Sequence, residues 1–218
     1  MEKTEQIDYI QKGWVHIKNF VPEFVVKELR ERAIKWRNWV EPKVGTPSKY
    51  GGPVHWKGLG CAGMYDEYLM EFYRHEIMEE LSSELLNTKD VWLYNDQLVV
   101  KLPNDNFKFE PHTDNSVGGN SNEGKNTVNI CVILDDFTDE NGTLEIFNKD
   151  DGEKVRVYPK AGDVVAIHGD TPHQSEPNNT EKPRCLYACV YSSEQLHFHN
   201  FYSVPFSENP RKKKISLL

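Results

Sequence analysis

The N-terminal part of the chain carries hydrophobic residues mostly at helical spacing. Residues 14–17 alternate in the way typical of a short strand, and Pro22 then fits the first position of a helix. The apolar residues of that helix recur at steps of three and four and so share one face: Val26, Leu29, Ala33, Trp36 and Val40. A second stripe of the same kind follows Asp66: Met70, Tyr73, Ile77 and Leu81. The pattern predicts that residues 1–90 form a mainly helical support.

From Val91 onward, short runs of β-branched and aromatic residues replace the helical pattern. Turn sequences such as Asn141-Gly142 separate these runs. The predicted strands are 91–102, 107–113, 127–134, 143–147, 155–158, 164–168 and 184–191. Helices followed by many short strands favour a mainly β fold with packed helices, such as a β-sandwich or jelly roll. We expect a single domain over residues 1–218, with the β core at about 91–192.

The predicted strand at 127–134 has two different faces. One face is wholly apolar and the other carries small polar groups, as two alternating sets show: Val128, Ile130, Val132 and Leu134 against Thr127, Asn129, Cys131 and Ile133. This alternation is typical of a strand that packs on a core with one face and lines a partly polar cavity with the other.

Composition and charge narrow the classes of partner. The formal net charge is −8, and the only basic run is at 211–214, which argues against nucleic acid as the main partner. No apolar stretch approaches the roughly 18 residues of a membrane span, and the first residues carry no apolar signal region. The four cysteines show no strong metal-ligand spacing. We therefore expect a cytoplasmic monomer or homodimer without nucleic-acid or membrane partners.

The sequence His112-Thr113-Asp114 places an imidazole and a carboxylate two positions apart. On a strand, residues i and i+2 share a face, so both side chains can reach one ion. Two histidines and one carboxylate on one face of an octahedral ion are the arrangement of non-haem iron(II) oxygenases. The open face of the ion is what a chelating 2-oxo acid and O2 require.

A second motif of the same form, His168-Gly169-Asp170, competes with the first. It runs into turn residues, so its side chains do not share a strand face, and too little chain follows it for the strands that a jelly roll places between its ligands. His173, by contrast, follows Asp114 by enough chain for several strands. The spacing therefore predicts the catalytic metal ligands His112, Asp114 and His173.

Two residues that follow the third ligand in the sequence, Ser175 and Arg184, are suited to bind an anionic co-substrate. Arg184 opens the next predicted strand, and its guanidinium fork can hold a carboxylate through two parallel hydrogen bonds. The hydroxyl of Ser175 can add a third. We expect the strand of Arg184 to lie beside the one that ends near His173, with Ser175 at the turn between them. Both residues are predicted to bind the distal carboxylate of 2-oxoglutarate.

Several segments together resemble the phytanoyl-CoA dioxygenase family. The resemblance is carried by five stretches of the chain: 13–17, 96–103 with His112-Thr113-Asp114, 134–144, 161–169, and His173-Gln174-Ser175 with Asn178 and Pro183-Arg184. These stretches cover most of the chain, and residues 41–93 are the least matched part. The resemblance implies a double-stranded β-helix, which is a cupin-like jelly roll, with iron(II) and 2-oxoglutarate as cofactor and co-substrate. It implies the metal ligands that the spacing predicts, and it implies that Arg184 and Ser175 bind the co-substrate carboxylate.

The resemblance also bears on residues outside the metal motif. Lys101 and Gln97 match positions that face the active site in related hydroxylases, where they touch co-substrate or substrate, although a lysine in an edge strand also protects against aggregation. Asn129 is either a satisfied core amide or a further co-substrate contact. Trp56 lies in residues 41–65, whose glycines and aromatics indicate either core packing or a lid that contacts substrate.

These residues predict an iron(II)- and 2-oxoglutarate-dependent dioxygenase with O2 and a small molecule as its substrates. We expect it to hydroxylate an amino-acid-like or natural-product intermediate with release of succinate and CO2. The alternatives are desaturation or cyclisation at the same centre, and a non-catalytic jelly-roll binding protein. A halogenase is disfavoured because such enzymes replace the carboxylate ligand with a small residue, whereas Asp114 is present. A cupin enzyme without 2-oxoglutarate would leave Arg184 without an evident role.

Overall fold

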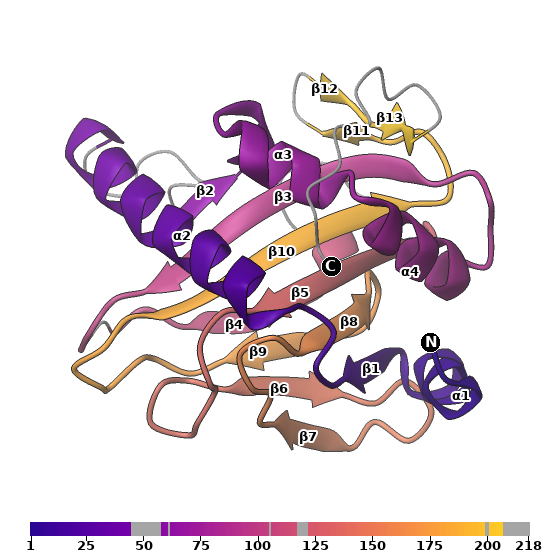
Figure 1. The fold of residues 1–218 in the computed structure, drawn as a ribbon. Helices are drawn as coiled ribbons and strands as arrows, with labels where there is room; N and C mark the ends of the chain where they lie inside the picture. Colours follow the sequence, from indigo (N-terminus) through magenta and orange to yellow (C-terminus); the bar gives the residue numbers. More distant parts are fainter. Residues whose placement is uncertain (45–57, 61, 105, 117–121, 199–200, 207–218) are drawn as a thin grey trace.

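Two antiparallel sheets face each other in the computed structural model, which describes residues 1–44, 58–60, 62–104, 106–116, 122–198 and 201–206 (Figure 1). In these residues the larger sheet has seven strands, in the order β1 (Trp14–Ile17), β8 (Val164–His168), β5 (Thr127–Ile133), β10 (Arg184–Ser192), β3 (Trp92–Lys101) and β13 (Val204–Pro205), with β2 (Gly58–Gly60) also on β3. The smaller sheet has the order β4 (Phe109–His112), β9 (His173–Ser175), β6 (Leu144–Phe147) and β7 (Lys154–Val157). A short hairpin joins β11 (His197–Phe198) to β12 (Phe201–Tyr202).

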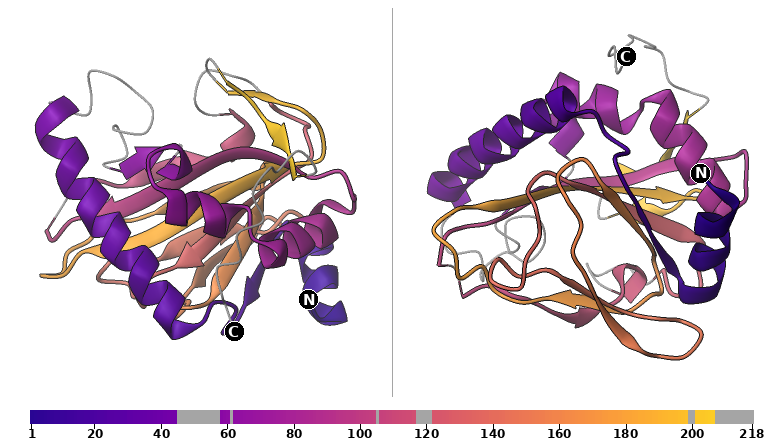
Figure 2. Two further views of the ribbon diagram at one scale, coloured as in Figure 1. Left: turned by 45° about the horizontal axis from the view of Figure 1, so that its top comes forward. Right: turned by 60° about the horizontal axis from the view of Figure 1, so that its bottom comes forward.

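The helices lie on the face of the larger sheet that points away from the smaller one (Figure 2). The α-helices are α1 (Lys3–Lys12), α2 (Glu23–Val44), α3 (Glu67–Tyr73) and α4 (Glu76–Leu86), and short 3-10 turns occur at η2 (Ala62–Met64) and η3 (Asp114–Ser116). No helix in the described ranges is long and apolar enough to cross a membrane. The predicted mainly β fold with packed helices is confirmed.

The larger sheet separates two apolar cores because successive side chains of a strand point to opposite faces. On β10, Tyr187 and Tyr191 are buried with the helices, whereas Leu186 and Ala188 are buried with residues of the smaller sheet. The helical layer is also held by polar contacts: the buried Asp96 accepts hydrogen bonds from the Tyr187 hydroxyl (2.6 Å) and from the backbone of η2 (2.7 Å). The predicted two-faced strand is β5, whose apolar set packs under the helices.

The N-terminal helices differ from the predicted pattern in two ways. Helix α1 was not predicted, because most of it is exposed and Tyr9 is its buried residue. The stripe after Asp66 forms two helices instead of one. Helix α3 begins at a cap in which Asp66 accepts from two backbone amides, and His75 adopts an extended conformation that caps α4 with its ring nitrogen. The helical spacing continues across this break, so the pattern alone does not reveal it.

Two glycines at positive φ allow a test of the packing around the smaller sheet. Gly142 (φ +77°) lies against backbone, because a Cβ there would be 1.9 Å from Glu176 O, whereas Gly152 (φ +73°) has nothing within 4 Å of its Cβ position. Gly152→Ala should lower the free energy of unfolding by about 1–2 kcal/mol through φ strain alone. Gly142→Ala should cost a further ~1–3 kcal/mol, because backbone must move. Urea unfolding measures both, and equal costs would contradict the close packing at Gly142.

Candidate metal centre and co-substrate pocket

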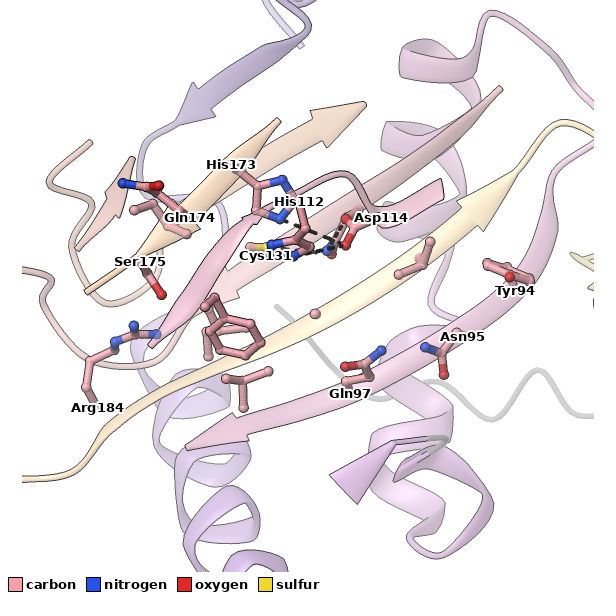
Figure 3. Close-up of a pocket in the computed structure, with 17 residues that line it drawn as sticks. Tyr94, Asn95, Gln97, His112, Asp114, Cys131, His173, Gln174, Ser175 and Arg184 are labelled. Carbon is pink, nitrogen blue, oxygen red and sulfur yellow. Dashed lines mark hydrogen bonds and ion pairs between the residues drawn. The ribbon is translucent and has the colours of Figure 1, made fainter. Parts of the chain in front are cut away.

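A pocket lies between the two sheets (Figure 3). Its wall on the larger sheet is formed by β3, β5 and β10, and the opposite wall by β4, β6, β9 and the turn η3. The predicted site residues that line it are His112, Asp114, Asn129, His173, Ser175, Arg184 and Gln97. The fold therefore brings together residues that are up to 87 positions apart in the sequence.

His112, Asp114 and His173 form the metal-binding group found within the described residues, with ligand atoms all within 4.8 Å of one another. His112 and His173 are direct partners in the pairing of β4 with β9. Each Nε2 atom lies 3.9 Å from Asp114 Oδ1. Strand β4 ends at His112, so Asp114 does not share a strand face with it, contrary to the prediction; the η3 turn brings the carboxylate to the same point.

Backbone hydrogen bonds orient both imidazoles. The Nδ1 atom of His112 lies 2.7 Å from Glu110 O, and that of His173 lies 3.0 Å from Thr171 O. A carbonyl can only accept, so each Nδ1 carries the proton and each Nε2 lone pair is left for a metal ion. Burial, together with His173, lowers the pKa of His112, which keeps that ring neutral near pH 7.

Asn129 holds the third ligand in place. Its amide Nδ2 donates to Asp114 Oδ2 at 2.9 Å, which leaves Oδ1 facing the two histidines. Asn129 is thus more than a satisfied core amide, and the co-substrate contact suggested for it stays a prediction. Its position on β5 follows from the predicted alternation, but its partner was not foreseen.

These three side chains fit a divalent metal ion. Two imidazole nitrogens and one carboxylate converge, and within the described ranges no lysine or arginine pairs with Asp114. An iron(II) ion would supply the missing positive charge and leave one face open.

The second motif, His168-Gly169-Asp170, lies outside this group. His168 ends β8 and its Nδ1 accepts a hydrogen bond from the backbone of Asp170 at 3.1 Å. The Asp170 carboxylate accepts from the side chain of Asn115 at 2.8 Å. The structure therefore places this motif in a supporting turn, as the sequence comparison of the two motifs predicts.

Arg184 is a buried cation at another part of the pocket wall. It is 1% exposed, donates from Nη2 to Gly142 O at 2.8 Å, and lies 4.2 Å above the ring of Phe137. Burial lowers the pKa of Arg184 to about 10, so it stays charged at neutral pH. No carboxylate forms an ion pair with it in the part of the chain that the structure describes. An unpaired buried charge is costly, and a bound anion would offset that cost.

Lys101 lies opposite Arg184 in the pairing of β3 with β10 and is also 1% exposed. Its Nζ donates to Ser175 Oγ at 2.7 Å, to Ser175 O at 3.0 Å, and to Glu176 O. Lys101 is not among the residues that line the pocket, whereas Ser175 is. The lysine thus fixes the serine at the pocket wall, and its predicted direct contact with a ligand stays a prediction.

The two predicted co-substrate residues come from opposite sheets. Ser175 belongs to β9 of the smaller sheet, and Arg184 to β10 of the larger sheet. The expected turn at Ser175 and the expected neighbouring strands are therefore wrong. The physical reason is that residues 176–183 cross from one sheet to the other, and local turn signals do not show which sheet a strand joins.

The remaining lining of the pocket is uncharged and combines polar with apolar side chains. Gln97 lines it as predicted, and Tyr94, Asn95 and Gln174, which the sequence analysis did not single out, line it as well. Alternation along β3 could have found Asn95, which is two positions from Gln97. A register shift in the pairing with β10 between Val190 and Tyr191 interrupts this alternation, so Tyr94 was harder to foresee. Trp56 lies outside the described residues.

Comparisons with known proteins agree with this geometry. A sequence model of the phytanoyl-CoA dioxygenase family matches residues 9–185. None of the curated proteins matches the sequence. Among solved structures, the non-haem α-ketoglutarate-dependent carbocyclase SnoK from nogalamycin biosynthesis is 19% identical, with a TM-score of 0.73 over 89% of this chain and 85% of that one.

Two further structures show the same fold. The α-ketoglutarate-dependent epimerase SnoN, also from nogalamycin biosynthesis, is 20% identical, with a TM-score of 0.72 over 88% of this chain and 83% of that one. EctD from S. alaskensis, solved with 2-oxoglutarate and 5-hydroxyectoine, is 15% identical, with a TM-score of 0.74 over 90% of this chain and 78% of that one. At these identities the solved structures support the fold, and the family model supports the class of enzyme.

The expected jelly-roll fold and the expected cofactors are confirmed at the level of the family. The matched region contains the metal-binding group and Arg184. The chain belongs to the phytanoyl-CoA dioxygenase family of iron(II)- and 2-oxoglutarate-dependent oxygenases.

Proposed function

We propose that this oxygenase hydroxylates a small molecule, with iron(II) held by His112, Asp114 and His173. One observation carries the assignment of the site: a single pocket contains a metal-binding group and, on another part of its wall, a buried arginine without a carboxylate partner among the described residues. A dianion that chelates a metal at one end and carries a second carboxylate at the other end matches this combination. 2-Oxoglutarate has this chemistry.

Each residue near the distal carboxylate would have a separate task. Arg184 supplies a fixed positive charge, and its contacts with Gly142 O and Phe137 hold the guanidinium in one orientation. Ser175 Oγ accepts from Lys101, so its own proton is free to be donated to a carboxylate oxygen. The buried ammonium of Lys101 adds to the positive potential of this region. We propose Arg184 and Ser175 as the binding residues and Lys101 as their support.

The residues at the metal end present three ligand atoms, which are two imidazole nitrogens and one carboxylate oxygen. The hydrogen bonds from both Nδ1 atoms to backbone carbonyls leave the Nε2 atoms as the metal-binding nitrogens, and Asn129 turns one carboxylate oxygen toward them. Bound iron(II) and 2-oxoglutarate supply O2 activation, with one oxygen atom going to succinate and the other to the product as CO2 is released. The protein's own contribution is orientation, charge and removal of the site from bulk water.

The substrate is proposed to bind next to Gln97, on the neutral polar part of the wall. Tyr94 and Asn95 lie there too, and the Tyr94 hydroxyl accepts from Asn122 at 2.7 Å. Neutral hydrogen-bonding side chains suit an uncharged polar region of an amino-acid-like or natural-product intermediate. A monomer or homodimer and a role for Trp56 in substrate binding stay predictions.

Desaturation or cyclisation is the second candidate reaction, because a carbocyclase and an epimerase share the fold. The same metal centre serves these outcomes, and the position of the substrate decides among them. A binding protein without turnover is the remaining alternative. It would bind 2-oxoglutarate without converting it.

Turnover separates these functions. Iron-loaded protein with 2-oxoglutarate and O2 is expected to form succinate faster when the correct member of a metabolite panel is present. Mass spectrometry of that metabolite should show the gain of one oxygen atom. Loss of two hydrogens would instead support desaturation or cyclisation. A protein that binds iron and 2-oxoglutarate yet forms no succinate with any member, even slowly, would favour the binding protein.

Substitution of each proposed ligand tests the metal centre. His112→Ala, Asp114→Ala and His173→Ala should each weaken metal affinity by more than the roughly 10–100-fold that loss of a supporting group causes. His168→Ala is the matched control, because it removes a histidine of the same spacing that lies outside the group, and it should retain most of the affinity. Anaerobic calorimetric titration with iron(II) gives these values. Loss of binding in His168→Ala with retention in His173→Ala would refute the assignment.

Arg184 separates 2-oxoglutarate enzymes from other metal-dependent jelly rolls. Arg184→Ala should raise the KM for 2-oxoglutarate at least about 30-fold, because loss of one partner of a buried charge pair costs about 2–5 kcal/mol. Arg184→Lys should recover only part of this, because an ammonium lacks the planar fork. A 2-oxo acid without the distal carboxylate should lose much of its disadvantage in Arg184→Ala.

Arg156→Ala is the control for the arginine prediction, because Arg156 is exposed, pairs with Glu145 and does not line the pocket. It should leave the KM for 2-oxoglutarate unchanged. An unaltered KM in Arg184→Ala would remove Arg184 from the co-substrate site and reopen the cupin alternative.

A further inference from the structure

The turn at residues 168–172 lies between β8 and β9. It contacts both chain segments that carry the proposed metal ligands. Asp170, at the centre of this turn, contacts the loop between β4 and β5, on which Asp114 lies. Its Oδ1 accepts from Asn115 Nδ2 at 2.8 Å, and its Oδ2 accepts from the backbone amide of Gly124 at 3.2 Å. One exposed carboxylate therefore holds two points of that loop.

Asn115, which follows the ligand Asp114, is almost completely enclosed at 2% exposure. Its amide Nδ2 also donates to Lys125 O at 3.0 Å, and its Oδ1 accepts from Thr127 Oγ1 at 2.7 Å. Its backbone donates to Gly169 O at 3.0 Å. The side chain and backbone of Asn115 thus tie the ligand loop both to itself and to the turn.

Glycine is required at the centre of this contact. A Cβ at Gly169 would lie 1.9 Å from Thr127 Oγ1 and 2.6 Å from Asn115 Oδ1. The turn backbone therefore packs directly on the side chains that fix Asn115. Such close approach transmits the position of the turn to the ligand loop without intervening flexible groups.

The same turn also orients the third ligand. Thr171 O is the acceptor for Nδ1 of His173 at 3.0 Å, and the Thr171 hydroxyl is anchored to Gly13 O at 3.0 Å. The turn therefore contacts Asp114's loop on one side and His173 on the other.

We propose that Asp170 is a positioning residue for the metal centre, holding the Asp114 loop against the turn that orients His173 so that the ligands are aligned before an ion binds. This inference rests on the proposed metal ligands. The aspartate of the second His-x-Asp motif thereby serves the first motif. Alignment in advance reduces the ordering cost of ion binding, which is how groups behind metal ligands commonly raise affinity.

A purely structural role would have a different signature. Asp170 is exposed, so its removal leaves no cavity, and water can replace it as acceptor for both amide groups. The free energy of folding should therefore change little. The position of the Asp114 loop, by contrast, should become less well defined, and metal affinity should fall.

The test is calorimetric titration of metal-free protein with Co(II) under argon. Asp170→Ala should bind Co(II) about tenfold more weakly than wild type. Asp170→Asn should lose less, because its Oδ1 can still accept from Asn115 while the contact with Gly124 is lost. Asp151→Ala is the matched control: Asp151 is likewise exposed and accepts a backbone hydrogen bond (2.8 Å from Glu153), but it lies in the β6–β7 turn. Its Co(II) affinity should equal that of wild type.

Two further measurements complete the test. The melting temperature of metal-free Asp170→Ala should change no more than that of Asp151→Ala. With saturating Co(II), the Kd for 2-oxoglutarate should stay within about twofold of wild type, because Arg184 and Ser175 are untouched.

The outcomes distinguish this inference from the function on which it rests. Failure of wild-type protein to bind Co(II) would contradict the metal centre itself. Wild-type affinity in Asp170→Ala would overturn the positioning role and leave the metal centre intact. A loss of affinity that accompanies a large fall in the metal-free melting temperature would assign Asp170 to general stability, and so would also overturn it.

Discussion

Buried positive charge is the main constraint on the space between the two sheets. Arg184 and Lys101 lie opposite each other on neighbouring strands and are each 1% exposed. Neither could be buried without acceptors, and backbone carbonyls of the 138–143 loop and of residues 175–176 provide them. These contacts connect β3 and β10 of the larger sheet to β9 of the smaller sheet and so help to hold the two sheets together. Among the described residues no carboxylate forms an ion pair with Arg184, which is why this interior suits an anionic ligand.

Each of the two sheets supplies different residues to the site. The larger sheet buries one face under the helices, which leaves its other face to supply Arg184, Asn129 and Gln97 to the pocket. The smaller sheet supplies both histidines as direct strand partners. Because each ligand sits at the end of a strand or in the turn that follows, its position depends on the connections as well as on the strands. The hydrogen bonds around Asn115 and Asp170 supply that support.

Solved structures with this fold are named for different reactions. The similar structures include a carbocyclase, an epimerase and a protein bound to 5-hydroxyectoine, although each is at most 20% identical to this chain. In the proposed function, the uncharged region around Gln97 and Asn95 would distinguish one substrate from another, because the co-substrate chemistry does not require this part of the pocket.

The sequence by itself determined the elements and the chemistry that depend on local spacing. Strand alternation from residue 91 onward, the His112-x-Asp114 pair and the single suitable histidine at 173 were readable because each concerns neighbours or order along the chain. Only the tertiary structure decided that Ser175 and Arg184 belong to opposite sheets, that Lys101 fixes Ser175, and that Asp170 contacts Asn115. The Lys101–Ser175 and Asn115–Asp170 contacts join residues that are 74 and 55 positions apart in the sequence. Periodicity records which face of an element is buried, but it does not record what that face meets.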